Sequence, residues 1–491
     1  MELRRVRDAC LAPTLSLALN QHRIAYAALT VLTLVRLTVA AAAPLAPDEA
    51  YYWVFSHALA PGYLDHPPMV ALWVRAGTLV AGQTELGVRL LGPLSVALGS
   101  VLLMDAADRL LPGRHAGIAA ATLLNATLLL GVGSAIMTPD TPLLFFWVAA
   151  LWATARLLHS GRGAWWLAIG AFAGLALASK YTAAFLWIGI GLWLCWVPSL
   201  RRWWASVWLW AGTALGGLVF LPVVLWNAAH HWASFVRQGG RVEDWHPARA
   251  AQFLGELVGG QFGLATPLLF VLFVAGVALA ARRAWRSRDP AWSLLAALTL
   301  PAAVVFVQHA FGDRVQGNWP AILYPAAAIA AAGLDPPRWT RWQAPAVAVG
   351  LAFTALVYIQ AVTFVLPLPA RLDPIARELG GWDTLARDVS AASQRSGAVF
   401  VAAGQYGVAS ELAWALPTDL PVVDDDPRWA FTTLPRLSLA GRTGILVQRA
   451  RDREPLEWAN AVPLNQVMGG RFRLWRVTAA DTKATRLPAR R

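Results

Sequence analysis

The chain has 491 residues, of which 57% are apolar and 14% charged, and it carries a formal net charge of +13. With a mean hydropathy of +0.49, this composition excludes an ordinary soluble core and indicates a polytopic α-helical membrane protein. A charge of +13 would suggest nucleic acid in a soluble chain. Here the arginines gather in short loops between apolar runs, where basic residues set the orientation of a membrane protein. We therefore expect no nucleic-acid partner. Cys10 and Cys195 provide no disulfide framework.

The amino-terminal segment imitates a secretory signal. Arg4, Arg5 and Arg7 precede an apolar run that ends in the small-residue segment AAAAPLA. The positive region is more than twenty residues long, however, which is too long for a typical signal peptide. We therefore predict an uncleaved signal anchor whose amino end lies in the cytoplasm.

Apolar runs between polar breaks predict about 11 to 13 membrane spans. The eleven clearest are 24–43, 85–104, 116–137, 140–158, 165–179, 181–198, 204–226, 262–281, 291–309, 319–333 and 343–366. The run 67–82 is short and interrupted by Arg75 and Gly77, so an amphipathic helix in the outer interface suits it better. The stretch 165–198 reads as two short spans hinged at Ser179 and Lys180.

The charges of alternate loops set the orientation. Loops on one side carry sixteen arginines, whereas loops on the other side carry five Lys or Arg, or seven if Arg75 and Arg89 are included. The positive-inside rule then places the loop of Asp48, together with Asp140 and Lys180, outside the cytoplasm. Eleven spans leave the carboxyl-terminal part outside as well.

The composition changes near Leu368, where spans stop and turn residues become frequent. The segments SGAVFVAA, LPVVDD, TGILVQRA and FRLWRV read as strands, with YGVASELAWAL as a helix between the first two. We predict a membrane domain over 1–367, with outer loops 44–84 and 227–261, followed by a small extracytoplasmic α/β domain over 368–491.

The outer face collects acidic residues. Asp48 and Glu49 follow the first span in APDEAYYW, and no Lys or Arg lies between Arg36 and Arg75 to neutralise them. Asp140 stands at the outer end of a later span. Carboxylates at a membrane surface can act as general base, metal ligand or proton carrier. We predict catalytic roles for Asp48, Asp140 and Glu49; a divalent metal is compatible with them, but nothing in the sequence requires one.

Cations and aromatic residues on the same face complete a candidate site. Lys180 is one of two lysines, the other being Lys483, and a compact ammonium suits a point contact to phosphate. Arg237 and Arg241 are four residues apart and would share a face if both were helical. The predicted phosphate-binding set is Lys180, Arg237 and Arg241, and the predicted cleft residues are Tyr51, Tyr52, Asp65 and Trp232.

Each of these residues also has a purely structural explanation. Asp48, Glu49 and Asp140 could cap the helices that follow them, and Lys180 could extend its charge to the interface. The histidines could be packed aromatic residues, the arginines could contact only lipid headgroups, and Tyr and Trp could anchor the interface. Their joint occurrence on one face favours a functional site.

At these positions the chain resembles the GT-C membrane glycosyltransferases, in particular the bacterial branch of protein mannosyltransferase-like enzymes and lipid A aminoarabinose transferases. The segments that carry the resemblance are PDEAYYW, YLDHPPM, TPDTPLLFFW, GLALASKYTA, LWNAAHHWASF and GNWPA, with a looser match in QYGVASELAWALP. They cover most of the membrane part.

The resemblance implies transfer of a sugar from a polyprenyl-phosphate carrier to an acceptor outside the membrane. It assigns the catalytic acid to Asp48, a second acidic role to Asp140 and carrier-phosphate binding to Lys180. The aminoarabinose transferases have an acidic residue and a Lys before two prolines, and that Lys is associated with the carrier phosphate. This chain has Asp65 and His66 there. The resemblance therefore adds His66 to the predicted phosphate-binding set, with a contact that is in doubt or pH-dependent. The DHPP form looks closer to enzymes that modify lipopolysaccharide with uronic acids or other sugars.

We therefore predict an inverting glycosyltransferase of the bacterial inner membrane. Its acceptor would be lipid A, lipopolysaccharide, another envelope glycan or a protein. No Rossmann fingerprint or P-loop points to a cytosolic nucleotide-sugar site. The main alternative is a transporter or flippase of a lipid-linked substrate, which would place charges near the bilayer midplane, often in paired halves. Arg36 is the clearest charge inside a span, and no two halves match. A third alternative is a non-catalytic lipid-binding or assembly factor.

Overall fold

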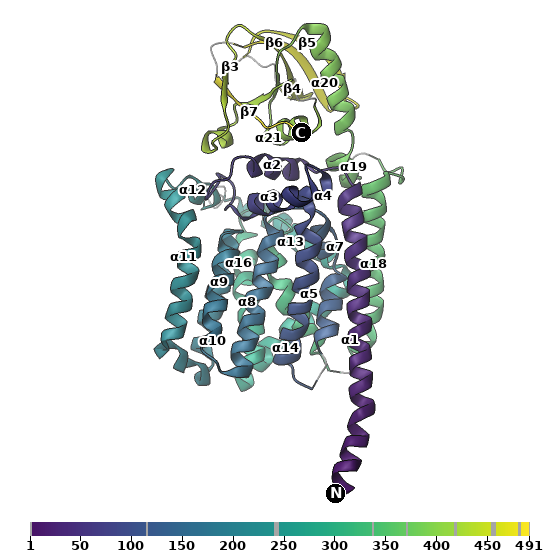
Figure 1. The fold of residues 1–491 in the computed structure, drawn as a ribbon, viewed down its shortest axis with the longest axis vertical. Helices are drawn as coiled ribbons and strands as arrows, with labels where there is room; N and C mark the ends of the chain where they lie inside the picture. The colour runs from purple at the N-terminus through teal and green to yellow at the C-terminus, as the bar shows by residue number, and fades with distance from the viewer. Residues whose placement is uncertain are drawn as a thin grey trace.

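The computed structural model has a helical bundle at one end, a mixed sheet at the other and a layer of short helices between them (Figure 1). It describes residues 2–113, 116–239, 245–335, 338–369, 372–416, 420–452, 458–479 and 483–490, with only the backbone of 2–19. The amino end of α1 lies at the end of the molecule opposite the sheet.

The bundle is built from long apolar helices joined by short turns. Its helices are α1 (Glu2–Ala42), α5 (Leu91–Leu110), α6 (Ala116–Asn125), α7 (Leu128–Ala135), α8 (Asp140–Ser160), α9 (Trp165–Leu177), α10 (Ala184–Trp196), α11 (Val207–Ala229), α13 (Ala250–Ala265), α14 (Pro267–Ser287), α15 (Pro290–Ala297), α16 (Leu300–His309), α17 (Tyr324–Ala332) and α18 (Thr340–Thr363). The described part has seven helical segments long and apolar enough to cross a membrane, or up to nine if each of two bent pairs is one span. The chain is thus a multi-pass membrane protein.

Each of the eleven predicted spans corresponds to helix in the structure, but not all are full-length. Two of them, Trp165–Leu177 and Trp319–Ala332, are shorter apolar helices, and two others belong to bent pairs. The α6–α7 pair bends by 68°, where the Thr127 hydroxyl accepts a hydrogen bond from the Leu130 amide and starts a new helix. Hydropathy measures the length of an apolar run but does not detect a helix cap within it, so the sequence predicted one continuous span here.

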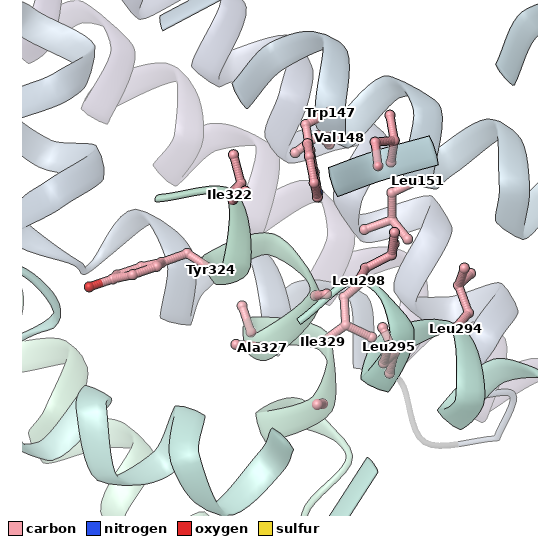
Figure 2. Close-up of a cluster of buried hydrophobic side chains, with 14 of the residues drawn as sticks. Trp147, Val148, Leu151, Leu294, Leu295, Leu298, Ile322, Tyr324, Ala327 and Ile329 are labelled. Atoms are coloured by element: carbon pink, nitrogen blue, oxygen red, sulfur yellow. The ribbon is translucent and has the colours of Figure 1, made fainter. Parts of the chain in front are cut away.

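The bundle core is packed with branched and aromatic side chains. Figure 2 shows Trp147, Val148 and Leu151 of α8 beside Leu294, Leu295 and Leu298 at α15, with Ile322, Tyr324, Ala327 and Ile329 from the α17 segment. These side chains belong to one buried cluster that runs through the bundle. Removing them from solvent and lipid fixes the relative positions of helices that carry polar residues at their outer ends.

A layer of short helices covers the end of the bundle nearest the sheet: α2 (Pro47–Ser56), α3 (Met69–Ala81), α4 (Glu85–Arg89), α12 (Ala233–Gly239) and α19 (Pro374–Leu379). The helix α3 matches the predicted interfacial helix over 67–82. It is tied to the bundle because the Met69 amide donates to the Ala178 carbonyl over 3.1 Å.

The carboxyl-terminal part is a seven-stranded mixed sheet with the order β3-β7-β2-β1-β4-β6-β5. Its strands are β1 (Val401–Ala403), β2 (Val422–Asp424), β3 (Arg436–Ser438), β4 (Thr443–Arg449), β5 (Ala459–Val467), β6 (Phe472–Thr478) and β7 (Lys483–Arg486), accompanied by α20 (Trp382–Ser396) and α21 (Tyr406–Ala415). β1 pairs in parallel with β2 and β4, and the other pairs are antiparallel. The four predicted strands and the helix are present, and β3, β5 and β7 are additional.

The helix α2 joins the sheet domain to the bundle. Tyr51, Trp53 and Phe55 of α2 share one buried cluster with Leu412 and Trp429 of the carboxyl-terminal part. Gly407 permits the close approach of α21, since a Cβ there would lie 3.0 Å from the Pro47 Cβ. The hydrophobic core therefore crosses the boundary that the sequence suggests near residue 367, and α21 is held against the first outer loop.

Candidate active site

The polar cleft under α21 draws its residues from segments far apart in the chain. Its lining includes Asp48, Tyr51, Tyr52, Asp65, His66, Thr138, Asp140, Lys180, Arg237, Gln238, Asn318, Tyr406 and Arg428, around a cavity of about 450 Å³. The acidic residues sit at helix starts: Asp48 follows Pro47 in the first turn of α2, and Asp140 begins α8. Helix amino ends favour carboxylates, so the local structure places both acids at the end of the bundle that faces the sheet domain.

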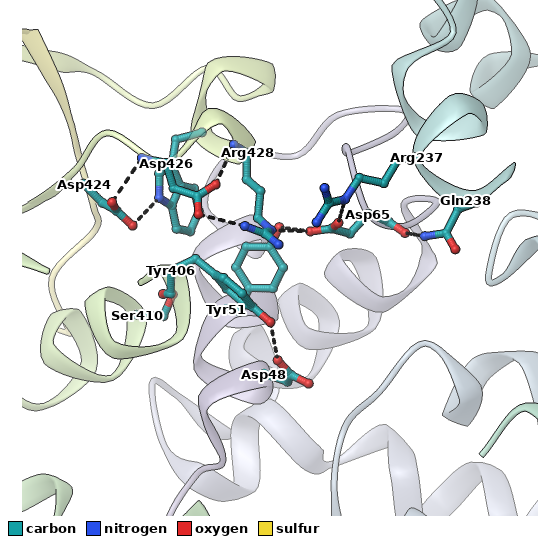
Figure 3. A network of polar contacts seen from close by, with 11 residues as sticks. Asp48, Tyr51, Asp65, Arg237, Gln238, Tyr406, Ser410, Asp424, Asp426 and Arg428 are labelled. Carbon is teal, nitrogen blue, oxygen red and sulfur yellow. Dashed lines mark hydrogen bonds and ion pairs between the residues drawn. The ribbon is translucent and has the colours of Figure 1, made fainter. Parts of the chain in front are cut away.

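Asp48 faces the cleft and is accessible to solvent. Its recorded partner among the described residues is the Tyr406 hydroxyl, which donates to Oδ1 over 3.2 Å (Figure 3). The surrounding protein still removes much of its water, and this partial burial raises the pKa of Asp48. The Tyr406 hydrogen bond lowers that pKa, and the charges of Glu378, Asp65 and Glu49 raise it. A carboxylate with a raised pKa and without a tight cation partner is suited to accept a proton.

Glu49 has a different environment from the adjacent Asp48. It is 1% exposed, and its two oxygens accept hydrogen bonds from Arg89 Nε over 2.7 Å and Nη2 over 2.5 Å. The Met137 and Ala46 amides also donate to this carboxylate. The expectation of two un-neutralised adjacent acids is therefore wrong, because Arg89 reaches Glu49 from forty residues away. With all these donors, Glu49 positions α2, and it is not free to act on a substrate.

Asp140 and Lys180 form an ion pair at the base of the cleft. Lys180 Nζ donates to Asp140 Oδ1 over 2.8 Å and to Oδ2 over 2.9 Å, and each side chain is 12% exposed. Asn318 donates from Nδ2 to the same carboxylate. An ammonium has three hydrogens, so Lys180 keeps one for a ligand, while Asp140 holds the ammonium in place.

Asp65 links the bundle side of the cleft to the sheet domain. It accepts hydrogen bonds from Tyr51 Oη over 2.9 Å, Arg237 Nε over 3.0 Å and Arg428 Nε over 2.7 Å, a chain that Figure 3 shows from Asp424 to Gln238. Burial would raise the pKa of Asp65, but Arg428, Tyr51 and His66 outweigh it and hold the pKa below its usual value. Asp65 is therefore an ionised anchor for two guanidinium groups.

The remaining predicted residues occupy varied positions. His66 and Tyr52 line the cleft with their ring centroids 5.8 Å apart, edge to face. Trp232, expected in the cleft, instead lies in the turn after α11, 46% exposed, with its ring stacked on Phe235. Arg241 lies outside the described residues, beyond the end of α12, so its predicted helical pairing with Arg237 is untested.

Several cleft residues were not singled out from the sequence. Tyr406 and Asn318 lie in two of the segments that carry the family resemblance, QYGVASELAWALP and GNWPA, so a sequence signal for them was present. Arg428 stacks over the Tyr406 ring with its Cζ 4.2 Å from the centroid, and no sequence signal indicated it. Among the described residues, no group of three or more His, Cys, Asp or Glu side chains could hold a metal ion.

An apolar cavity adjoins the cleft at its membrane side. It has a volume of about 290 Å³ and is walled by residues of α5, α7 and α8, with Leu264 and Tyr324. Thr138, Asp140 and Asn318 line both this cavity and the polar cleft. The two cavities therefore suit a ligand with a long apolar chain and a polar end group. The chain would lie in the apolar cavity and the polar group in the cleft.

Comparisons with known proteins agree with this architecture. Residues 65–226 match the family model described as dolichyl-phosphate-mannose-protein mannosyltransferase. The lipid A galacturonosyltransferase RgtD of Rhizobium johnstonii is 30% identical over 299 residues, 60% of this chain. That alignment spans only 61% of the relative's length.

Solved structures of ArnT from Cupriavidus metallidurans share the fold. The apo structure aligns over 94% of this chain and 98% of its own, with a TM-score of 0.62 and 16% identity. The structure bound to undecaprenyl phosphate aligns over 93% and 98%, with a TM-score of 0.63 and 14% identity. The chain is a membrane protein of the GT-C glycosyltransferase fold, as its motifs predicted.

The raised pKa of Asp48 predicts the pH dependence of a reaction in which it acts as base. Only the ionised form accepts a proton, so the rate should fall on acidification at a higher pH than an ordinary Asp would give. Tyr406→Phe removes the hydrogen bond that lowers this pKa, so it should move the acid limb to still higher pH. The measurement is kcat/KM against pH for both proteins. An unmoved acid limb in Tyr406→Phe would contradict the assignment.

Proposed function

We propose that this protein is an inverting glycosyltransferase that moves a sugar from a polyprenyl-phosphate carrier to an extracytoplasmic acceptor of the lipid A or lipopolysaccharide class. The observation that carries the proposal is the placement of a pKa-raised carboxylate, Asp48, in one cleft with Lys180 and Arg237, beside an apolar cavity. The name of the relative RgtD, a lipid A galacturonosyltransferase, and the undecaprenyl phosphate bound to ArnT support the acceptor and carrier classes.

The carrier phosphate would lie against Lys180, with part of the isoprenoid chain in the apolar cavity. Lys180 offers its third N–H. Arg237 lines the cleft and is 43% exposed, and its ion pair with Asp65 uses Nε, which leaves its two terminal nitrogens as donors for a ligand. In the reaction, the acceptor oxygen bonds to the anomeric carbon while the bond from that carbon to the phosphate oxygen breaks. The leaving polyprenyl phosphate takes the electron pair and is stabilised by these cations.

Asp48 would take the proton of the acceptor hydroxyl as the new bond forms. Asp140 acts through Lys180, because it holds the ammonium that contacts the phosphate. We further propose that 1–367 forms the catalytic membrane domain and 368–491 the outer domain. Residues of both domains line the cleft, which would lie on the extracytoplasmic face of a bacterial inner membrane. The excess of arginine at the opposite loops supports this orientation.

The alternative of a flippase finds less support in the charges of the bundle. Arg36 lies inside the bundle, 0% exposed, and donates from Nη1 to Asn125 Oδ1 over 2.8 Å. A neutral amide partner and full burial make it a fixed structural contact, not part of a polar path. Mass spectrometry of envelope glycolipids with and without the protein separates the two: a transferase changes the sugars on an acceptor, while a flippase changes the distribution of an unaltered lipid.

Lys180 tests the carrier site directly. Lys180→Met should weaken binding of undecaprenyl phosphate about tenfold to a hundredfold, as expected for losing a charge-assisted contact of about 1.5–3 kcal/mol. Lys180→Arg should recover part of the affinity, since a planar fork fits a point-charge site imperfectly. Equilibrium binding to the purified full-length protein is the measurement.

The pairing with Asp140 requires matched controls. Lys180→Met leaves Asp140 without its cation, and that unpaired carboxylate would itself repel the phosphate. The double variant Lys180→Met with Asp140→Asn removes the repulsion, so its affinity should lie between those of Lys180→Met and the wild type, and the remaining loss measures the ammonium alone. Asp140→Asn alone keeps the ammonium and should retain most of the affinity. Wild-type affinity in a folded Lys180→Met protein would refute the carrier role of Lys180.

A further inference from the structure

A further cavity, of about 730 Å³, lies between Asp48 and the sheet domain. It lies between the amino end of α2 and the carboxyl-terminal part of the chain, and Asp48, Thr138 and Tyr406 line both it and the polar cleft. Asp48 therefore stands at the junction of two chambers, one with Lys180 and the other formed largely by the sheet domain and α19.

Four arginines from three segments line this cavity: Arg377 of α19, Arg449 at the end of β4, Arg451 just after it and Arg471 before β6. The acids in its lining are Asp48, Glu378 and Glu49, and Arg89 already neutralises Glu49. Arg377 pairs with Glu378 at 3.5 Å, but that pair is about half exposed and weak for that reason. The lining is therefore net positive.

Three of these arginines, Arg377, Arg449 and Arg471, lie close enough for their charges to act on one another. Burial lowers the pKa of Arg471, Glu378 raises it, and the positive charges of Arg377 and Arg449 lower it. The Arg471 guanidinium also lies 5.6 Å from the Phe472 ring centroid and 6.0 Å from that of Trp382, contacts that orient it. Like charges held together around a cavity repel one another, and an oxyanion placed between them relieves that repulsion. Guanidinium groups bind phosphate and carboxylate through paired hydrogen bonds.

The chemistry of inversion assigns an occupant to this chamber. In an in-line displacement the acceptor oxygen approaches the anomeric carbon from the face opposite the leaving phosphate. If the phosphate lies against Lys180, the acceptor enters from the other side of Asp48, which is the arginine chamber. Arg377 and Glu378 of α19 line the chamber, and α19 lies just beyond the end of α18 that is nearer the sheet (Figure 1). The chamber is therefore within reach of the polar head of a membrane-anchored lipid.

We propose that the arginine chamber is the acceptor site, and that it recognises an oxyanion, phosphate or carboxylate, on the saccharide head of a glycolipid acceptor. This inference rests on the proposed function, because it uses Lys180 and Asp48 to define the direction of attack. It adds the sheet domain as the part of the chain that selects the acceptor by charge.

The test is equilibrium binding of three lipids to the purified full-length protein in nanodiscs. The probes are bisphosphorylated lipid A, dephosphorylated lipid A, and dephosphorylated lipid A extended with carboxylate sugars. We expect one or both acidic probes to bind at least tenfold more tightly than the neutral probe, and the stronger of the two identifies the anion. Equal binding of all three would overturn the proposal.

Substitutions locate the site. Arg449→Gln with Arg471→Gln should weaken binding of the preferred acidic lipid at least tenfold and leave undecaprenyl phosphate binding unchanged. That second readout also shows that the variant is folded. Arg476→Gln is the matched control, since Arg476 is an exposed arginine of β6 outside the chamber, and it should change neither affinity.

The outcomes separate this inference from the proposed function. A wild-type protein that binds undecaprenyl phosphate but does not prefer an acidic acceptor lipid would refute the inference alone. Failure to bind undecaprenyl phosphate would refute the carrier role on which both depend. Equal loss of acidic-lipid binding in Arg476→Gln would also overturn the assignment, because it would indicate attraction to the general positive charge of the domain.

Discussion

Asp48→Asn is expected to reduce sugar transfer by about a hundredfold or more while the protein remains folded. The amide keeps nearly the same volume but cannot accept the proton of the acceptor hydroxyl. Its structural cost should be small, because Asp48 faces the cleft and, in the part of the chain that the structure describes, its hydrogen bond is with the Tyr406 hydroxyl. The loss should appear in kcat, since the contacts proposed for carrier and acceptor come from other residues.

Three measurements distinguish a lost base from lost structure. The variant should keep wild-type affinity for undecaprenyl phosphate and wild-type thermal stability, and its remaining rate should lack the acid limb attributed to Asp48. Tyr406→Phe provides the comparison, since it alters the surroundings of the carboxylate but leaves it present. Full transfer activity in Asp48→Asn would exclude Asp48 as the base, and weakened carrier binding would indicate a different role.

Hydropathy and charge were sufficient for much of the fold because the bilayer imposes strong constraints. Every predicted span corresponds to helix, since a segment in lipid must satisfy its own backbone. The short strands β3 and β7 lacked such a signal. They have three and four residues, and their pairing depends on contacts between segments more than forty residues apart along the chain.

The candidate site was only partly accessible to sequence reasoning. Helix starts and exposed loops carry recognisable acids, so Asp48 and Asp140 could be selected from their positions alone. The sequence could not show that Asp48 is accessible while Glu49 is buried and paired, because this difference depends on Arg89, which reaches Glu49 from α4. Arg428 was hidden for a similar reason: it comes from the sheet domain and reaches Asp65, 363 residues away, through a contact that no local pattern encodes.

Arg89 should have the largest effect on stability among these residues. Its guanidinium binds both Glu49 oxygens and donates to the carbonyls of Ala40, Ala43 and Pro44, while both side chains of the pair are 1% exposed. Arg89→Met would leave the buried Glu49 carboxylate without its cation and three carbonyls without the Arg89 donors. Breaking a buried pair in this way costs about 3–5 kcal/mol in the free energy of unfolding.

A surface pair provides the matched control. Arg314 and Glu256 are 2.9 Å apart but 70% and 33% exposed, so Arg314→Met should cost about 0–1 kcal/mol. The measurement is the unfolding midpoint of each purified variant in the same detergent. Adding Glu49→Gln to Arg89→Met removes the stranded charge and should restore part of the loss, as coupled residues do in a double-mutant cycle.

The same contacts predict a functional consequence. Arg89 ties the first turn of α2 to the end of α1, and that turn carries Asp48 beside Glu49. Arg89→Met should therefore lower transfer even at temperatures where the protein is folded, because the base loses its fixed position relative to Lys180. Its binding of undecaprenyl phosphate should change little, since Lys180 is held by Asp140 from another helix. Equal stability losses in Arg89→Met and Arg314→Met, or full activity in folded Arg89→Met, would contradict this positioning role.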